Sequence, residues 1–145
     1  MLKIGVLKSS KRAPLGVTPE SLKKWPSNTT RFLIEKNAGS FSHYNDAEFI
    51  SGGAKIVSRS EVIEQSNILV ISDNLSDRDF KILHVDTMVL GLLNPYNNQD
   101  FIAKLKKRKQ KAFALEMLPR TSNAQSMDAL SAMASLAGYK SVILA

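Results

Sequence analysis

A short polar segment near the carboxyl end of the chain carries the side chains best suited to chemistry. Arg120 opens the segment, and Gln125 and Asp128 follow it at positions i and i+3 of a predicted helix, so that they share one helix face. Arg120 precedes the helix and can fold back onto Asp128. Such an ion pair would fix the segment and leave the Gln125 amide facing outward as a donor and acceptor.

A purely structural role fits the same residues. Gln125 can close a capping box with Ser122, and the Arg120–Asp128 pair can serve only to pin the start of the helix. Spacing alone favours this structural role. Position favours a binding role, because ligands of parallel α/β sheets bind at the loops that follow the strands. Both interpretations stay open at this point.

Other chemistry is poorly represented in the sequence. The chain has no cysteine, which excludes disulfides, zinc–thiolate sites and thiol nucleophiles, and it has neither a P-loop nor a G-x-G-x-x-G motif. His43 and His84 have no second ligand at metal-binding spacing, so we expect no metal. Asp73, Asp77 and Asp79 surround a predicted helix start, where they fit turn and dipole roles.

Size and composition indicate one soluble domain. The chain has 145 residues and a mass of 16.0 kDa, with 43% apolar and 23% charged residues. No apolar run approaches the roughly 20 residues that a membrane-spanning helix needs, and no secretory signal is present. We expect a cytosolic or equivalent reducing compartment.

The net charge of +7 is concentrated in residues 104–111. We interpret this cluster as a solvated helix end, where cations interact favourably with the helix dipole. No aromatic residues alternate with the cations, as stacking on bases would require, so a nucleic-acid partner is not expected.

Apolar runs alternate with amphipathic stretches along most of the chain. The runs predict strands at residues 3–7, 31–35, 55–57, 67–72, 87–92 and 111–115. Helices are predicted from Thr18 to Pro26 and at residues 46–50, 60–65, 76–83 and 98–109. This alternation predicts an open three-layer α/β/α domain with a mainly parallel, Rossmann-like or flavodoxin-like sheet.

The last 24 residues predict one long helix that starts at Ser122. One stripe is apolar and is expected to face the core: Met127, Leu130, Met133, Ala134 and Ala137. The opposite arc is short and polar, as expected where a helix lines a cleft: Gln125, Asp128, Ser131, Ser135 and Tyr139. Residues 142–145 end without a C-cap, so we expect that the chain was cut or normally continues, and that it self-associates through residues 142–144.

Residues 119–140, with the sequence PRTSNAQSMDALSAMASLAGYK, resemble a segment of the alpha subunits of the proton-translocating NAD(P) transhydrogenase family. Weaker similarities lie at residues 3–7, 18–20, 35–39, 53–57 and 94–95. Together they cover essentially the whole chain, which resembles the amino-terminal domain shared by alanine dehydrogenases and transhydrogenases.

The resemblance implies a role for each candidate residue. Arg120, Gln125 and Asp128 match an Arg-Gln-Asp loop that lies beside the nicotinamide of NAD(H), at the contact with the NADP(H)-binding component. Ser131 and Tyr139 match positions near the bound nucleotide. The implied reaction is direct hydride transfer between the two nicotinamides, coupled to proton translocation. The cofactors would carry the chemistry, with Gln125 and Ser131 orienting them.

Three positions depart from the alanine dehydrogenases. These enzymes hold their keto-acid substrate with an arginine and a lysine and use a catalytic histidine, but Pro14, Ile71 and Asn94 stand at the matching positions. Without a cation for the carboxylate or a general acid, amino-acid dehydrogenation is poorly supported.

We therefore interpret residues 1–145 as the first subdomain of a transhydrogenase NAD(H)-binding component, without the family's Gly-rich nucleotide domain. The expected partners are the NADP(H)-binding and membrane components and a second copy in a homodimer. Through these partners the chain would lie on the cytoplasmic or matrix face of a membrane. Alone it should bind NAD(H) weakly and not turn over. The alternatives are a divergent alanine dehydrogenase half and a non-catalytic interaction domain.

Overall fold

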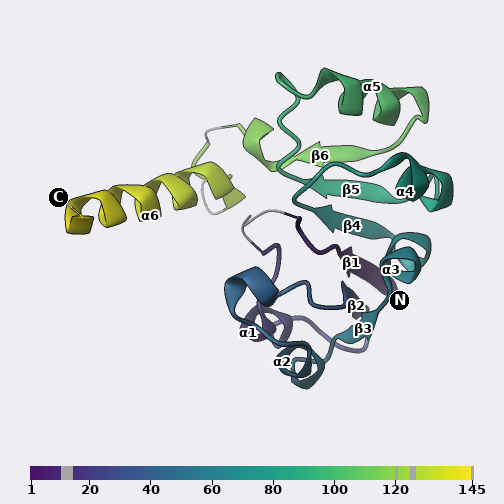
Figure 1. The fold of residues 1–145 in the computed structure, drawn as a ribbon, viewed down its shortest axis with the longest axis horizontal. Helices are drawn as coiled ribbons and strands as arrows, with labels where there is room; N and C mark the ends of the chain where they lie inside the picture. Colours follow the sequence, from purple (N-terminus) through teal and green to yellow (C-terminus); the bar gives the residue numbers. More distant parts are fainter. Residues whose placement is uncertain (11–14, 120, 125–126, 145) are drawn as a thin grey trace.

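A computed structural model describes residues 1–10, 15–119, 121–124 and 127–144 of the chain. The strands are β1 (Leu2–Val6), β2 (Thr30–Glu35), β3 (Lys55–Val57), β4 (Ile68–Ile71), β5 (Met88–Gly91) and β6 (Ala112–Ala114). Every pair of neighbouring strands is parallel, and the order across the sheet is β3-β2-β1-β4-β5-β6 (Figure 1). The predicted α/β class is confirmed, and each strand lies within one residue of its predicted range. The chain reverses its direction of travel across the sheet between β1 and β4, which is the topological switch point.

The helices and 3₁₀ turns alternate with these strands. They are α1 (Pro19–Leu22), η1 (Ser40–Ser42), α2 (Asp46–Ser51), α3 (Arg59–Gln65), α4 (Asp77–Ile82), α5 (Gln99–Lys107), η2 (Leu115–Met117) and α6 (Ala129–Leu144). The side chains of Thr18, Asn45, Ser58 and Ser76 each accept a backbone hydrogen bond at a helix start, as capping residues do. The first helix is a single turn and ends at Leu22, earlier than the predicted stop at Pro26.

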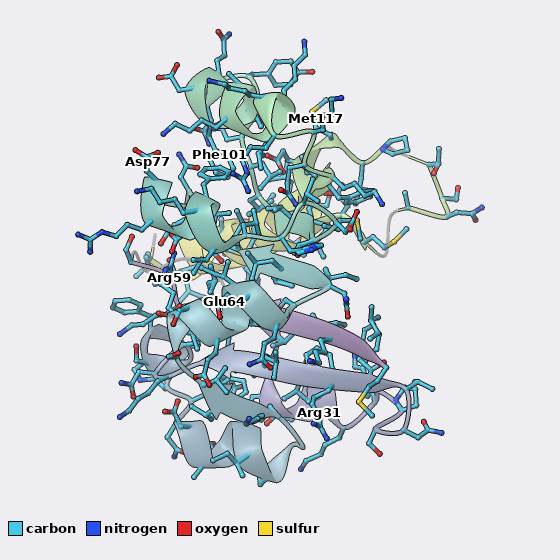
Figure 2. All side chains as sticks on the ribbon, turned by 90° about the vertical axis from the view of Figure 1, so that its right-hand side faces the viewer. Arg31, Arg59, Glu64, Asp77, Phe101 and Met117 are labelled. Carbon is cyan, nitrogen blue, oxygen red and sulfur yellow. The ribbon has the colours of Figure 1, made fainter. Side chains whose placement is uncertain are left out.

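Alternate side chains of the sheet enter two separate cores. On the first face, Leu69, Ile71 and Val89 pack with apolar residues of α3, α4 and α5. Figure 2 shows these three helices one below another, carrying Phe101 on α5 and Asp77 on α4, above Glu64 on α3.

On the second face, α1 and α2 cover only one half of the sheet. Leu22 of α1 and Phe49 of α2 pack with Ile4 of β1 and with Phe32 and Ile34 of β2. The two helices therefore lie over the strands on one side of the switch point, and the same face of β5 and β6 belongs to neither core cluster.

The last helix, α6, starts at Ala129 rather than at the predicted Ser122. It extends away from the sheet beyond the carboxyl ends of the strands (Figure 1). No residue of α6 is buried, and Met127, Leu130 and Met133 are all at least 43% exposed, so the predicted core-facing stripe is wrong. The periodicity of the segment gave its helical character, but α6 has no core to face in this chain. Among the described residues, no helix is long and apolar enough to cross a membrane.

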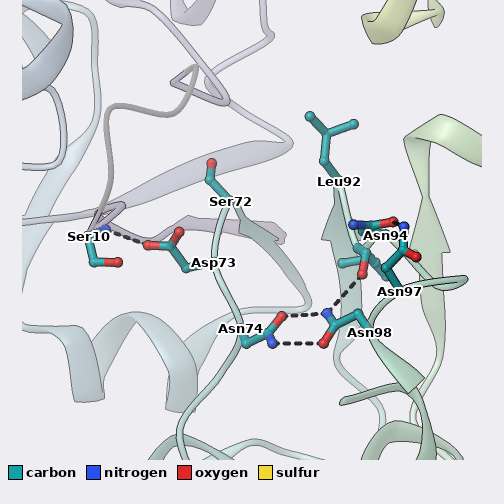
Figure 3. Close-up of a pocket in the computed structure, with 9 residues that line it drawn as sticks. Ser10, Ser72, Asp73, Asn74, Leu92, Asn94, Asn97 and Asn98 are labelled. Atoms are coloured by element: carbon teal, nitrogen blue, oxygen red, sulfur yellow. Dashed lines mark hydrogen bonds between the residues drawn. The ribbon is translucent and has the colours of Figure 1, made fainter. Parts of the chain in front are cut away.

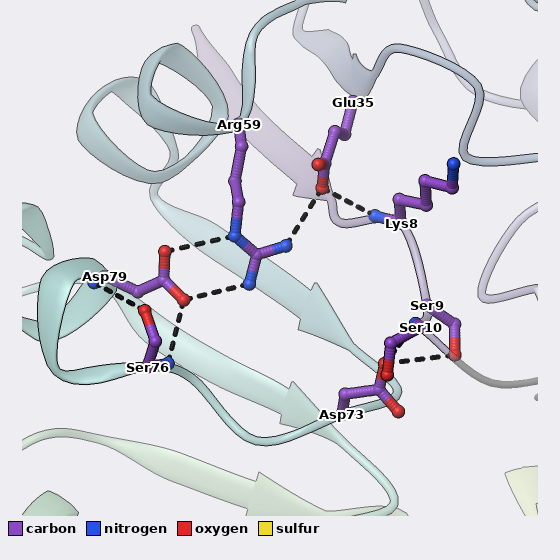
Figure 4. Close-up of polar contacts among 8 residues, drawn as sticks. All are labelled: Lys8, Ser9, Ser10, Glu35, Arg59, Asp73, Ser76 and Asp79. Atoms are coloured by element: carbon purple, nitrogen blue, oxygen red, sulfur yellow. Dashed lines mark hydrogen bonds and ion pairs between the residues drawn. The ribbon is translucent and has the colours of Figure 1, made fainter.

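One arginine joins the two halves of the sheet (Figure 4). Arg59, the first residue of α3, donates to Glu35 at the end of β2 at 3.1 Å. It also binds both carboxylate oxygens of Asp79 in α4, at 3.0 and 2.9 Å. The backbone N–H of Lys8 donates to the same Glu35 oxygen at 2.8 Å. This Arg59 bridge holds together segments from both sides of the switch point.

The bridge changes the acid–base behaviour of its partners. Burial by itself raises the pKa of Asp79, but hydrogen bonds from Arg59 and from the Ser76 backbone outweigh it, so the pKa lies below its ordinary value. The hydrogen bond to Asp79 raises the pKa of Arg59. Because the folded-state pKa of Asp79 is depressed, its ionised form stabilises the fold above the unfolded-state pKa. That stability is lost as the pH falls through the folded-state value.

Replacing Arg59 with leucine should lower the free energy of unfolding at pH 7 by about 2 kcal/mol, because nearly buried Asp79 loses its charged hydrogen bonds. Urea unfolding measures the loss, and the exposed Arg78→Leu on α4 is the control, with an expected change within about 0.5 kcal/mol. The parent should lose stability below about pH 4, and R59L should lose less over that range. Equal unfolding free energies for R59L and R78L would contradict this role of the bridge.

Candidate functional site

A polar pocket opens at the carboxyl ends of β4 and β5, next to the loop that follows β1 (Figure 3). Its volume is about 580 Å³. It is lined by Ser10, Ser72, Asp73, Asn74, Leu92, Leu93, Asn94, Asn97 and Asn98. The pocket thus lies beside the switch point, the place where open α/β sheets bind ligands. We call it the amide pocket, because four of its nine residues are asparagines.

Paired amides connect the loops on either side of the amide pocket. Asn74 and Asn98 exchange two side-chain hydrogen bonds, at 2.9 and 2.7 Å, and Asn98 also donates to the Leu93 carbonyl at 3.0 Å. These bonds tie the loop after β4 to the start of α5. The pocket wall is therefore hydrogen-bonded and largely uncharged.

The remaining carboxylate of the pocket, Asp73, serves the loop after β1. Its oxygen accepts from the Ser9 hydroxyl at 3.2 Å and from the Ser10 backbone N–H (Figure 4). Asp77 lies in the first turn of α4, and Asp79 accepts the bonds of the Arg59 bridge. The predicted turn and dipole roles of these three aspartates agree with this geometry.

Glu116 of η2 links the amide pocket to a second cavity. The backbone N–H of Asn94 donates to its Oε1 atom, and Asn94 adopts a left-handed conformation with φ of 47°, which asparagine tolerates better than most residues. The other oxygen, Oε2, is buried and has no hydrogen-bond partner among the described residues. An acceptor without a donor is therefore available at this point.

The second cavity, of about 170 Å³, lies between η2 and the first turns of α6. It is lined by Glu116, Leu118, Asp128, Leu130, Ser131 and Ala134. Asp128 caps α6, because its Oδ1 atom accepts from the N–H groups of Leu130 and Ser131 at 3.0 and 3.1 Å. The Ser131 hydroxyl donates to the other oxygen of Asp128 at 2.6 Å. The carboxylate and the hydroxyl are thus held in one fixed arrangement at the cavity wall.

Backbone bonds fix the segment that leads into α6. The N–H of Ala124 donates to the Thr121 carbonyl at 3.0 Å, and the N–H of Met127 donates to the Ala124 carbonyl at 2.9 Å. The Ala124 side chain is buried, although its described neighbours are exposed. The predicted binding loop is therefore anchored at both of its described ends.

The predicted site residues fall into three groups. Arg120 and Gln125 lie outside the described residues, so the predicted Arg120–Asp128 pair stays a prediction. Asp128 and Ser131 lie together in the second cavity. Tyr139 is 71% exposed and lies eight residues further along α6, about 12 Å along the helix axis, so the structure does not bring it to that cavity.

The positions that depart from the alanine dehydrogenases are also separated. Ile71 is a buried residue of the first core, and Asn94 lines the amide pocket, while Pro14 lies outside the described residues. An aliphatic side chain and an amide cannot neutralise a substrate carboxylate or donate a proton as a general acid.

Sequence reasoning missed Glu116 and three of the four asparagines of the amide pocket. Asn74, Asn97 and Asn98 follow predicted strands β4 and β5, and this position was the available signal. Glu116 carried no signal, because its contact with Asn94 joins residues 22 positions apart. The described residues contain no cluster of three potential metal ligands.

Comparison with known proteins places this geometry in a family. Residues 8–137 match the model of the alanine dehydrogenase/PNT, N-terminal domain. The first of the split NAD(P) transhydrogenase alpha subunits of Rickettsia prowazekii is 33% identical over 134 residues, which cover 88% of this chain. The match covers 34% of the Rickettsia protein, so the chain spans about a third of the length of that relative.

Two solved structures share the fold. A transhydrogenase from Sinorhizobium meliloti superposes with a TM-score of 0.83 at 28% identity, over 96% of this chain and 43% of that one. An L-alanine dehydrogenase superposes with a TM-score of 0.71 at 21% identity, over 83% of this chain and 35% of that one. The second similarity shows a common fold.

Removing the Asp128 carboxylate should destabilise the start of α6. We expect Asp128→Ala to lower the local stability of the helix by about 1 kcal/mol, because two backbone N–H groups lose their acceptor. Asp128→Asn should retain the cap, since asparagine is an equally good N-cap. Hydrogen exchange of the amides of residues 130–134 measures the effect. Equal protection in D128A and D128N would show that Asp128 is not the cap.

Proposed function

The chain belongs to the alanine dehydrogenase/PNT, N-terminal domain family, and we propose that it supplies one wall of the nicotinamide site in an NAD(P) transhydrogenase. In this proposal residues 1–145 form the first subdomain of the NAD(H)-binding component. Its activity is hydride transfer between NAD(H) and NADP(H), coupled to proton translocation by the whole assembly.

The fixed Asp128–Ser131 pair is the observation that carries the proposal. Both residues lie where an Arg-Gln-Asp loop is expected, at the start of α6 and beyond the carboxyl edge of the sheet. Their mutual bond of 2.6 Å holds the hydroxyl and carboxylate in place without any ligand. Preorganised groups of this kind suit a reaction in which the protein mainly orients its reactants.

The described residues suit the nicotinamide end of the cofactor. Glu116 Oε2 lacks a donor among these residues, and a ribose hydroxyl or a carboxamide N–H would provide one. The loop after β1 has no Gly-rich turn to hold a pyrophosphate. We therefore expect this chain to contact the nicotinamide and its ribose, and the diphosphate to be held elsewhere.

The residues of this chain position the reactants and transfer no proton in the proposed mechanism. When bound, the two nicotinamides supply the hydride donor and acceptor. Gln125 offers an amide to orient a ring, Arg120 and Asp128 fix the loop, and Ser131 contacts a ribose. Tyr139 is proposed to lie near the same nucleotide, on a more distant part of α6. No metal takes part in this scheme.

The structural features support transhydrogenation better than amino-acid dehydrogenation. Among the described residues that line the amide pocket there is no cation, and Asn94 replaces the general acid. A keto-acid carboxylate would therefore lack a counter-charge from these residues. No observation favours the alanine dehydrogenase half or the non-catalytic interaction domain as a second candidate.

The proposal includes partners. The NADP(H)-binding component would approach the loop at residues 120–128, and a membrane component would keep the assembly at the cytoplasmic or matrix face. We also propose that the NAD(H)-binding component is a homodimer.

Replacing Gln125 with alanine in the complete assembly should slow hydride transfer about tenfold to a hundredfold, because loss of orientation costs up to about that much. The affinity for NADH should change far less, since most of the dinucleotide is held by other groups. Stopped-flow transfer rates and NADH titration measure the two effects separately.

The matched control is Ser135→Ala, which lies on the same arc of α6 as Ser131 and whose hydroxyl donates to the Ser131 carbonyl. It should leave the transfer rate unchanged. A Q125A rate equal to that of the parent, or reduction of NAD by L-alanine in the parent, would overturn the proposed function.

A further inference from the structure

One half of the sheet has an uncovered face. Met88 and Leu90 of β5 and Phe113 of β6 point to the second face, because Leu90 pairs in register with Val70 and Phe113, and Val70 packs with the second core. Phe113 is 44% exposed, and Met88 and Leu90 are half-buried. We call Met88, Leu90 and Phe113 the open face. Parallel sheets are normally covered on both faces, so this apolar surface lacks a covering layer.

The same chain contains a helix that lacks a surface to cover. Its arc formed by Met133, Leu136, Ile143 and Leu144 is 43–75% exposed. This docking arc points away from η2, because Leu130, Ser131 and Ala134, on the other side of α6, line the cavity against η2. Apart from that contact α6 extends away from the sheet (Figure 1). A helix with few charges and no partner is unfavourable in water.

We propose that α6 of one copy packs its docking arc on the open face of a second copy, and that the second copy does the same in return. The proposal rests on the homodimer proposed above and not on the nucleotide chemistry. Each copy then supplies what the other lacks, a helix for the sheet and a sheet for the helix. The interface is closed and two-fold, which limits the assembly to a dimer.

The position of α6 prevents it from covering the open face of its own chain. Its first turn is capped by Asp128 and rests against η2, and the rest of the helix continues away from the strands. Folding back would require the first turns to leave η2 and the second cavity to be lost. A second copy receives the helix without any change at this junction.

The dimensions of helix and sheet agree. A helix of 16 residues is about 24 Å long and about 10 Å wide, which matches about two strand spacings. Its footprint of about 240 Å² would be buried on helix and sheet in both copies, about 1,000 Å² in total. A specific interface needs about that area as a minimum.

The chemistry of the two surfaces also agrees. Leu136 and Ile143 are one helical stripe, and they would meet the aliphatic and aromatic side chains of the open face. Lys140 is the only charged residue of α6, and its aliphatic stem can lie along an apolar surface while its ammonium stays in water. Asp128 and Ser131 lie on another arc, so the exchange leaves the second cavity accessible.

Cross-linking between two single-cysteine variants tests the contact directly, because the chain has no cysteine of its own. Leu136→Cys lies at the centre of the docking arc, and Leu90→Cys lies at the centre of the open face. The two variants, distinguished by tags of different size, are mixed and treated with a short bismaleimide. We expect a mixed dimer, with a yield several-fold above that of Leu136→Cys mixed with Glu64→Cys. Glu64 is exposed on α3, which covers the opposite face of the sheet.

Sedimentation equilibrium, without nucleotide, provides the second test. The parent should change with concentration from 16.0 kDa to twice that mass. Leu136→Asp with Ile143→Asp should remain monomeric, because two carboxylates would be buried on an apolar face. The matched control is Ser135→Asp with Val142→Asp, which puts two aspartates at the same spacing on another arc of α6. This control should dimerise like the parent.

Several results would overturn the proposal. These are a parent that is monomeric at all concentrations, assemblies larger than a dimer, cross-linking of Leu136→Cys only to itself, and equal behaviour of the two aspartate variants. The measurements contain no NAD(H), so a negative result leaves the proposed function standing. Conversely, an unaffected transfer rate in Q125A leaves the dimer standing.

Discussion

The need to cover a parallel sheet on both faces governs this molecule. Strands such as β4 carry apolar side chains toward both sides, and each side requires a layer of helices. Three helices meet that need on the first face, but α1 and α2 reach only the strands on one side of the switch point. The location of the polar loops, the exposure of Phe113 and the isolation of α6 all follow from this uneven coverage.

The same topology determines where ligand-binding groups gather. All strands are parallel, so their carboxyl ends meet at one edge, and the loops after β1, β4, β5 and β6 converge there. The amide pocket and the second cavity are neighbours at this edge, joined by the bond between Asn94 and Glu116. Their walls consist of amides, hydroxyls and carboxylates that bond to one another. An edge of this composition favours recognition of neutral polar groups such as a carboxamide or a ribose over chemistry that needs a strong acid.

The sequence predicted the strands well because each is a short apolar run bounded by turn residues, which is a local signal. It also identified Thr18 and Ser76 at helix starts from the residue types alone. The start of α6 could not be placed, because Ser122 with Gln125 and Asp128 with Ser131 show the same spacing, and only the second pair could be seen to form the cap. The apolar stripe could not reveal whether a core lay opposite. Likewise, the contacts of Arg59 and Glu116 join distant segments, and no local pattern encodes them.

The Arg59 bridge has a consequence for how the domain opens. Its guanidinium binds Glu35, which belongs to the outer half built from β1 to β3, and Asp79, which belongs to the half built from β4 to β6. Neither half can unfold locally without stranding a charge of the other, so their opening transitions become thermodynamically linked. The domain should then behave as one cooperative unit along the shared edge, and slow fluctuations should be confined to the far end of α6.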